Sequence, residues 1–152
     1  MFEEKTLLYC TPFYFNDGNN NKPKYFLVLK QIGDNVIVAN LLSSKNYVPF
    51  ADKNIRSGCT DFTELNFKCY CILKDIPITN TGFSFPLNTF IYGKWVEDYK
   101  LETLSLTYRV ENEDYDNCGR LNDDIYIALL ECLKDAPDIK RKYKKMIADW
   151  LV

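Results

Sequence analysis

The chain has 152 residues, is 47% hydrophobic and 15% aromatic, and carries a formal net charge of −2 at pH 7. That charge argues against a DNA-binding protein of the usual basic type, because no overall positive field would attract a polyanion, and any nucleic-acid binding must come from a local patch. The sequence contains no histidine, which excludes Ser-His-Asp hydrolases, Cys-His proteases and histidine-ligated metal sites. A chain of this length suits a single domain over 1–152 with its own hydrophobic core.

The N-terminal stretch MFEEKTLLYC lacks the pattern of a targeting signal. It begins with acidic residues, whereas a signal peptide has a basic start and a longer apolar run. No segment approaches the roughly 20 apolar residues of a transmembrane helix. We therefore predict a cytoplasmic protein that does not associate with a membrane.

The cysteines are predicted to be reduced, because the cytosol keeps thiols in that state. They are Cys10, Cys59, Cys69, Cys71, Cys118 and Cys132. Only Cys69 and Cys71 lie close together, and their spacing would put both on the same face of a strand. Small buried hydrophobic residues are the favoured interpretation. A zinc site, which usually uses closely spaced cysteine pairs, is the alternative.

The first part of the chain predicts a hairpin. A polar loop over 16–21 (NDGNNN) precedes an apolar run over 25–29, and a second apolar run covers 36–42. Both runs read as strands, and the turn residues Gly33-Asp34-Asn35 between them favour a hairpin. The following segment, 43–59, is irregular and contains a small basic set at Lys45, Lys53 and Arg56.

Further short strands are predicted downstream. Residues 66–73 (NFKCYCIL) alternate in hydrophobicity, as expected of a strand. A loop over 77–88 leads to a strand over 89–96, and another strand is predicted over 104–110. Short, evenly spaced strands of this kind indicate a small β-barrel over about 1–110.

The pattern changes to a helical period in the C-terminal part, about 122–152. Asn122, Asp123 and Asp124 offer capping oxygens for a helix that continues to Lys134. A second helix is predicted over 137–150, with Pro137 in its first turn. Its apolar stripe consists of Ile139, Tyr143, Met146, Ile147 and Trp150. Its basic residues are Lys140, Arg141, Lys142, Lys144 and Lys145, which we interpret as a solvated face, with a surface for phosphate or an acidic partner as the alternative.

Three stretches and a helix start, taken in order, resemble a known family. The stretches are NDGNNNKPKYFLVLK, VIVANLLSSK and SFPLNTFIYGKWVEDYKLETL, and the acidic helix start LNDDIYIALL follows them. They are similar to the Gly-rich loop and first strand, the IVAPITS-type strand, the late strand and the last helix of the MazF/PemK toxins of bacterial toxin–antitoxin modules. The resemblance runs from Lys22 to Leu133. It implies a mainly β fold with C-terminal helices, built as an SH3-like barrel.

The same resemblance implies a toxin-like, metal-independent endoribonuclease without a cofactor, which forms a homodimer and binds an antitoxin protein. The family's catalytic pair is an Arg that opens the first strand and a Thr or Ser that ends the second. Lys24 stands at the first position, and Ser43 and Ser44 follow Leu42, which aligns with the second. Lysine supplies a point charge, whereas arginine bonds two phosphate oxygens at once. A general base would have to be a shifted lysine or a carboxylate such as Asp17 or Asp52.

A binding function without catalysis is the alternative. Bases of single-stranded RNA stack on aromatic rings along a basic groove. The candidates for stacking are Tyr14, Tyr25, Tyr47 and Phe50, near the basic residues Lys22, Lys24, Lys45 and Arg56. We therefore keep two hypotheses open: an endoribonuclease with Lys24, Ser43 and Ser44 at its site, and a non-catalytic RNA- or protein-binding module on the same barrel. In either case Lys22, Lys45, Arg56 and Tyr47 are the predicted RNA contacts.

Overall fold

The computed structural model describes residues 2–10, 24–43, 56–62 and 67–152. Within these ranges the strands form two antiparallel sheets. The five-stranded sheet has the order β8 (Val96–Lys100), β3 (Asn35–Asn40), β2 (Lys24–Ile32), β1 (Thr6–Cys10) and β9 (Tyr115–Arg120). The four-stranded sheet has the order β4 (Leu42–Ser43), β7 (Thr89–Tyr92), β6 (Phe67–Ile72) and β5 (Gly58–Phe62).

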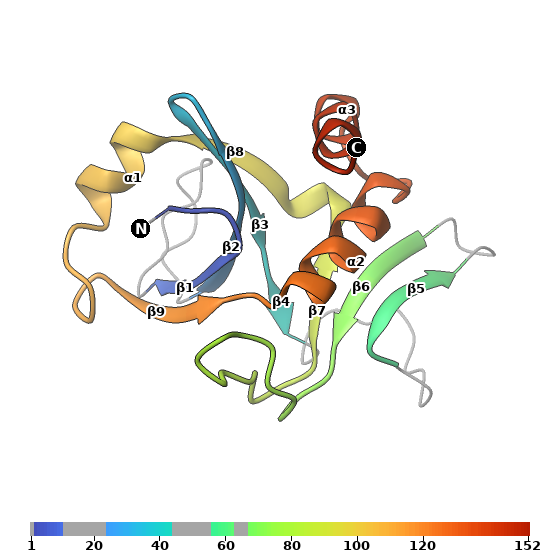
Figure 1. Cartoon of the computed structure of the whole chain (residues 1–152), viewed down its shortest axis with the longest axis horizontal. Helices are drawn as coiled ribbons and strands as arrows, with labels where there is room; N and C mark the ends of the chain where they lie inside the picture. The colour runs from blue at the N-terminus through green and yellow to red at the C-terminus, as the bar shows by residue number, and fades with distance from the viewer. Residues whose placement is uncertain (1, 11–23, 44–55, 63–66) are drawn as a thin grey trace.

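Three α-helices complete the described structure. They are α1 (Leu101–Thr107), α2 (Asp123–Lys134) and α3 (Arg141–Trp150), and a short 3-10 helix, η2 (Gly93–Trp95), links β7 to β8. Figure 1 shows α2 between the two sheets, with α3 near it at the C-terminal end. None of the helices in the described ranges has the length and apolar character needed to cross a bilayer.

The predicted hairpin is confirmed. Strands β2 and β3 pair in antiparallel fashion from Phe26 opposite Asn40 to Ile32 opposite Asn35. The turn therefore consists of Gly33 and Asp34, and Gly33 has a φ of 56°, which suits glycine in a tight hairpin turn.

The central strands β1, β2 and β3 of the five-stranded sheet are buried on both faces along much of their length, which explains their continuous apolar runs. One face contributes Leu7, Leu27, Leu29 and Ile37 to the main core, which also contains side chains of the four-stranded sheet, α2 and α3. The other face contributes Leu8, Phe26, Val28 and Val36 to a second cluster that includes Leu104 of α1. The buried hydroxyl of Tyr126 in α2 donates to the main-chain oxygen of Leu29 at 2.6 Å, which ties the helix to the sheet.

The expectation of a mainly β fold that ends in helices is confirmed. The described strands form two sheets, and no closed barrel is found among them, so the SH3-like barrel stays a prediction. The strand predicted over 104–110 is wrong, because most of that segment belongs to helix α1. The strand predicted over 89–96 is interrupted by η2, and the last helix begins at Arg141, after Pro137 rather than around it.

The prediction that all cysteines are reduced is also wrong. Cys59 on β5 and Cys132 on α2 form a disulfide, with their Cα atoms 5.6 Å apart. The prediction came from the expected compartment, whereas the packing of β5 beside α2 brings these two residues to bonding distance. Cys69 and Cys71 do share a face of β6, are buried and have their sulfur atoms 3.7 Å apart. In the described residues no group of three or more Cys, Asp or Glu side chains gathers as a metal site would require.

Candidate functional site

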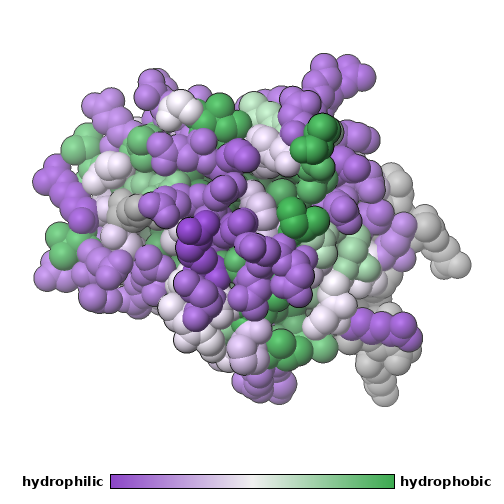
Figure 2. Space-filling view, viewed as in Figure 1, coloured by the Kyte–Doolittle hydropathy of each residue, from purple (hydrophilic) through white to green (hydrophobic). Residues whose placement is uncertain are grey.

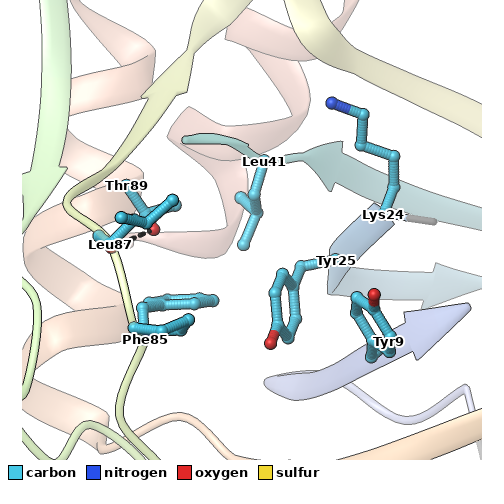
Figure 3. A pocket seen from close by; sticks show the side chains of 8 residues that line it. Tyr9, Lys24, Tyr25, Leu41, Phe85, Leu87 and Thr89 are labelled. Carbon is cyan, nitrogen blue, oxygen red and sulfur yellow. Dashed lines mark hydrogen bonds between the residues drawn. The ribbon is translucent and has the colours of Figure 1, made fainter. Parts of the chain in front are cut away.

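A hollow of about 190 Å³ opens between the beginning of β2 and the segment that leads into β7. Its lining residues are Tyr9, Lys24, Tyr25, Leu41, Phe85, Pro86, Leu87 and Thr89. In Figure 3 the rings of Tyr9 and Tyr25 lie next to each other on β1 and β2, with Leu87 and Thr89 across from them. The Lys24 side chain extends along the rim, and its ammonium group points away from the two rings.

A second, larger hollow of about 590 Å³ adjoins the first, because both are lined by Tyr9 and Tyr25. Its other lining residues are Thr81, Gly82, Phe83, Asp116, Asn117 and Cys118. This volume lies in the range typical of small-ligand sites in proteins. We call the two adjoining hollows together the tyrosine site.

Strand pairing places the central residues of the tyrosine site in one row. Tyr9 on β1 lies opposite Tyr25 on β2 and opposite Asp116 on β9. Directly opposed residues of antiparallel strands project from the same face of a sheet. Two tyrosine rings and one carboxylate therefore line up across three adjacent strands.

The aromatic rings of the site contact one another. The ring centroids of Tyr9 and Tyr25 are 4.5 Å apart, and those of Tyr25 and Phe85 are 5.0 Å apart in an edge-on arrangement. Phe83 lies 5.7 Å from Tyr25 and 5.3 Å from Phe85. Phe85 is buried, whereas Tyr9, Tyr25 and Phe83 are half-buried. The result is a continuous aromatic surface that is anchored in the core and open to solvent on one side.

Hydrogen bonds fasten the Phe83 segment to strand β9. The hydroxyls of Thr79 and Thr81 both donate to the main-chain oxygen of Cys118, at 2.9 and 2.8 Å. The amide of Phe83 donates in turn to the Thr79 hydroxyl at 3.2 Å. Gly119 has a φ of 102°, and a Cβ there would come within 2.7 Å of the Thr81 hydroxyl oxygen. Glycine at this position therefore lets the loop dock on β9 and hold Phe83 beside Tyr25.

Two titratable groups that face the site, Tyr25 and Cys118, have pKa values shifted toward their neutral forms. Burial, with smaller contributions from Cys118, Tyr9 and Asp116, raises the pKa of Tyr25. Burial and the nearby Asp116 raise the pKa of the Cys118 thiol to about 11. At neutral pH Tyr25 is therefore a hydroxyl donor, and Cys118 is an uncharged thiol rather than a nucleophilic thiolate.

The structure places one of the predicted catalytic residues, Lys24, at the first hollow and gives the strand register of a second, Ser43. Lys24 lines this hollow, and Ser43 on β4 lies opposite Thr89, another lining residue, in the β4–β7 pairing. Arg56 is exposed and precedes β5, which β6 separates from β7, so the fold does not bring it to this hollow. The other predicted residues, Lys22, Ser44, Lys45 and Tyr47, lie outside the described residues, as do Tyr14, Asp17, Phe50 and Asp52.

The sequence pattern did not predict most of the residues that form the tyrosine site. Tyr25 was a stacking candidate, but Tyr9, Phe83, Phe85 and Asp116 were not. Tyr9 and Asp116 belong to strands β1 and β9, neither of which was predicted. The only local signal was the density of aromatic residues in FSF, residues 83–85, within a predicted loop, because aromatic residues are unusual where a loop has no packing partner.

The basic residues of the last helix form a separate surface. Lys140, Arg141, Lys144 and Lys145 are exposed, and Lys142 forms an ion pair with Asp98 at 3.3 Å. Figure 2 shows many hydrophilic side chains on the face of the molecule seen in Figure 1, and hydrophilic and hydrophobic side chains lie together over α3. The opposite side of α3 carries the predicted stripe, of which Tyr143 and Ile147 are buried. None of these basic residues lines the tyrosine site.

Comparison of the chain with protein-family models, with curated proteins and with solved structures finds no match. The resemblance to the MazF/PemK toxins accordingly rests on the sequence stretches alone, and the geometry of the tyrosine site is the basis for a functional proposal.

Proposed function

We propose that the protein is a single-stranded RNA-binding module, which stacks bases on Tyr9 and Tyr25 and contacts the sugar–phosphate backbone through Lys24. The observation that carries this proposal is the half-buried pair of tyrosine rings beside a lysine at the rim of a hollow. Single-stranded nucleic acids bind to such surfaces, because bases stack on aromatic side chains while cations follow the phosphates.

The arrangement of the rings favours a flat ligand over a small cation. An aromatic cage for an ammonium group needs open space between ring faces. Here the rings contact one another, with centroid separations from 4.5 to 5.7 Å. The rings are inclined to one another by 47° to 88°, so they form a stepped surface on which a planar ring can lie against the face of one ring at a time. The base is the planar part of a nucleotide.

The charges at the rim support a defined orientation of the strand. The Lys24 ammonium points outward from the rings (Figure 3), where it would meet a phosphate while the adjoining base contacts the stepped surface. On the other side of Tyr9, Asp116 would repel a phosphate, so the backbone should run along the Lys24 side. The net charge of −2 gives little long-range attraction, so binding should depend on contacts inside the site.

The test is the affinity for a fluorescently labelled, mixed-sequence single-stranded RNA, measured by anisotropy. Tyr9→Ala should weaken binding about 5- to 150-fold, because one stacked base contributes about 1–3 kcal/mol. Lys24→Ala should weaken binding and make it less salt-dependent, since one phosphate contact is lost. The matched controls are Trp150→Leu and Lys100→Ala, which remove an aromatic ring and an exposed cation outside the tyrosine site. Equal losses in the controls and the site variants would refute the proposal.

Toxin-type RNA cleavage at the same place is the second candidate. It is supported by Lys24, which lines the first hollow and stands where the resemblance expects the family's Arg. The β4–β7 register also puts Ser43, which follows the position of the family's Thr or Ser, opposite the lining residue Thr89. On this reading the protein is a toxin-like endoribonuclease with an SH3-like barrel, and its partners are a second copy of the chain and an antitoxin. A long RNA incubated with the protein and chelator separates the two candidates. Discrete fragments that disappear with Lys24→Ala support cleavage, and intact RNA with measurable binding supports the module.

A further inference from the structure

We propose that the tyrosine site selects guanine, with the Asp116 carboxylate accepting hydrogen bonds from the base's N1–H and 2-amino groups. This inference rests on the proposed RNA binding and names the base that the site reads. It starts from a feature that a general stacking platform does not need: a carboxylate directly beside the ring on which the base would lie.

The position of Asp116 suits the edge of a stacked base. Asp116 lies opposite Tyr9 in the β1–β9 pairing, and both residues line the larger hollow. Opposed side chains of an antiparallel pair have their Cβ atoms about 5 Å apart. Asp116 is exposed, and within the described residues its carboxylate has no hydrogen bond or ion pair. A base that lies on the Tyr9 ring would therefore present its edge to this carboxylate.

A carboxylate discriminates among the bases because it only accepts hydrogen bonds. Guanine has two neighbouring donors, N1–H and the 2-amino group, which match the two carboxylate oxygens. Uracil presents carbonyl oxygens on both sides of its single N–H, and these repel a carboxylate. Adenine and cytosine each offer an amino group next to an acceptor nitrogen. Guanine is thus the only standard base that can bond both oxygens of Asp116 along its Watson–Crick edge.

Asn117 follows Asp116 on β9 but projects from the other face of the sheet. It pairs opposite Leu8, which belongs to the second cluster, whereas Asp116 pairs opposite Tyr9. The Oδ1 atom of Asn117 accepts a hydrogen bond from the amide of Gly119 at 2.9 Å. The proposed selection of guanine therefore depends on the two oxygens of Asp116, which match the N1–H and 2-amino donors of that base.

The experiment measures the affinity of the 152-residue chain for labelled oligouridine strands that carry one central guanine, adenine or hypoxanthine. The guanine strand should bind about 5- to 150-fold more tightly than the adenine strand, which is the range for one good bidentate contact. The hypoxanthine strand should fall between them, because that base lacks only the 2-amino group. Asp116→Asn should bring the guanine and adenine strands to within about twofold of each other. Glu113→Gln, an equal charge change at an exposed residue outside the site, should keep the preference.

The outcomes distinguish a failure of guanine selection from a failure of RNA binding at the tyrosine site. Binding without a guanine preference, or a preference that survives Asp116→Asn, overturns guanine selection and leaves RNA binding intact. A failure of every strand to bind overturns both. The hypoxanthine comparison uses the unaltered protein, so its result does not depend on how the variants fold.

Discussion

The disulfide between Cys59 and Cys132 makes a large and simple prediction about stability. The bridge joins residues 73 positions apart. In the chain-entropy model, cross-linking a loop of that length removes about 15 cal/mol/K from the unfolded chain, which corresponds to about 4 kcal/mol at 25 °C. Reduction with dithiothreitol should therefore lower the urea midpoint by about 2 M, given a typical slope of about 2 kcal/mol/M.

The assay compares urea unfolding of protein purified without reductant, before and after addition of dithiothreitol. Cys59→Ser combined with Cys132→Ala should unfold like the reduced protein and no longer respond to reductant. Cys118→Ser, which removes an unbridged thiol, should keep the response. The denatured, unreduced protein should show four reactive thiols, from Cys10, Cys69, Cys71 and Cys118. Six reactive thiols, or a midpoint that reductant leaves unchanged, would refute the reasoning.

Three further substitutions probe contacts that hold the fold. Tyr143→Phe should lower the free energy of unfolding by about 1–2 kcal/mol at pH 7, because its hydroxyl donates to Asp98. That bond, helped by Lys142, lowers the pKa of Asp98 below 3.8. The difference in the free energy of unfolding between wild type and Tyr143→Phe should thus be present above about pH 4 and shrink as the pH falls through the lowered pKa of Asp98. A difference that stays constant in urea titrations down to about pH 2 would contradict this. Gly119→Ala should cost about 2–4 kcal/mol, from its φ of 102° and the close approach to Thr81, and an unchanged thermal midpoint would count against it. Tyr126→Phe should cost about 1–3 kcal/mol, because a buried main-chain oxygen of β2 loses its donor; an equal urea midpoint would contradict that role.

The parts of the fold that could be predicted are those whose signals are local. The β2–β3 hairpin follows from two apolar runs around Gly33 and Asp34, and α2 follows from a capping segment before a helical stripe. Helix α1 was mistaken for a strand because Leu104 and Leu106 alternate with polar residues. In the structure Leu104 is buried and Leu106 is 57% exposed, so that alternation does not mark a buried sheet face.

The candidate site was harder to predict, because its residues meet only through long-range pairing. Strand β9 has the sequence YDNCGR, and Asp, Asn and Gly are unfavourable in strands. Its place at the edge of the sheet explains why such residues are tolerated there. Asp116 reaches Tyr9 only because β9 pairs with β1, far away in the sequence. Lys24 could be proposed from a resemblance between short motifs, whereas no local pattern could show which rings line the hollow beside it.

The most direct test of RNA binding at the tyrosine site is photo-crosslinking of a bound single-stranded RNA, followed by mass spectrometry of the digested protein. The structure predicts that cross-links fall on Tyr9, Tyr25 or Phe83, which form the open aromatic surface. Cross-links confined to the Lys140–Lys145 segment of the last helix, or their absence under conditions where anisotropy detects binding, would contradict the account.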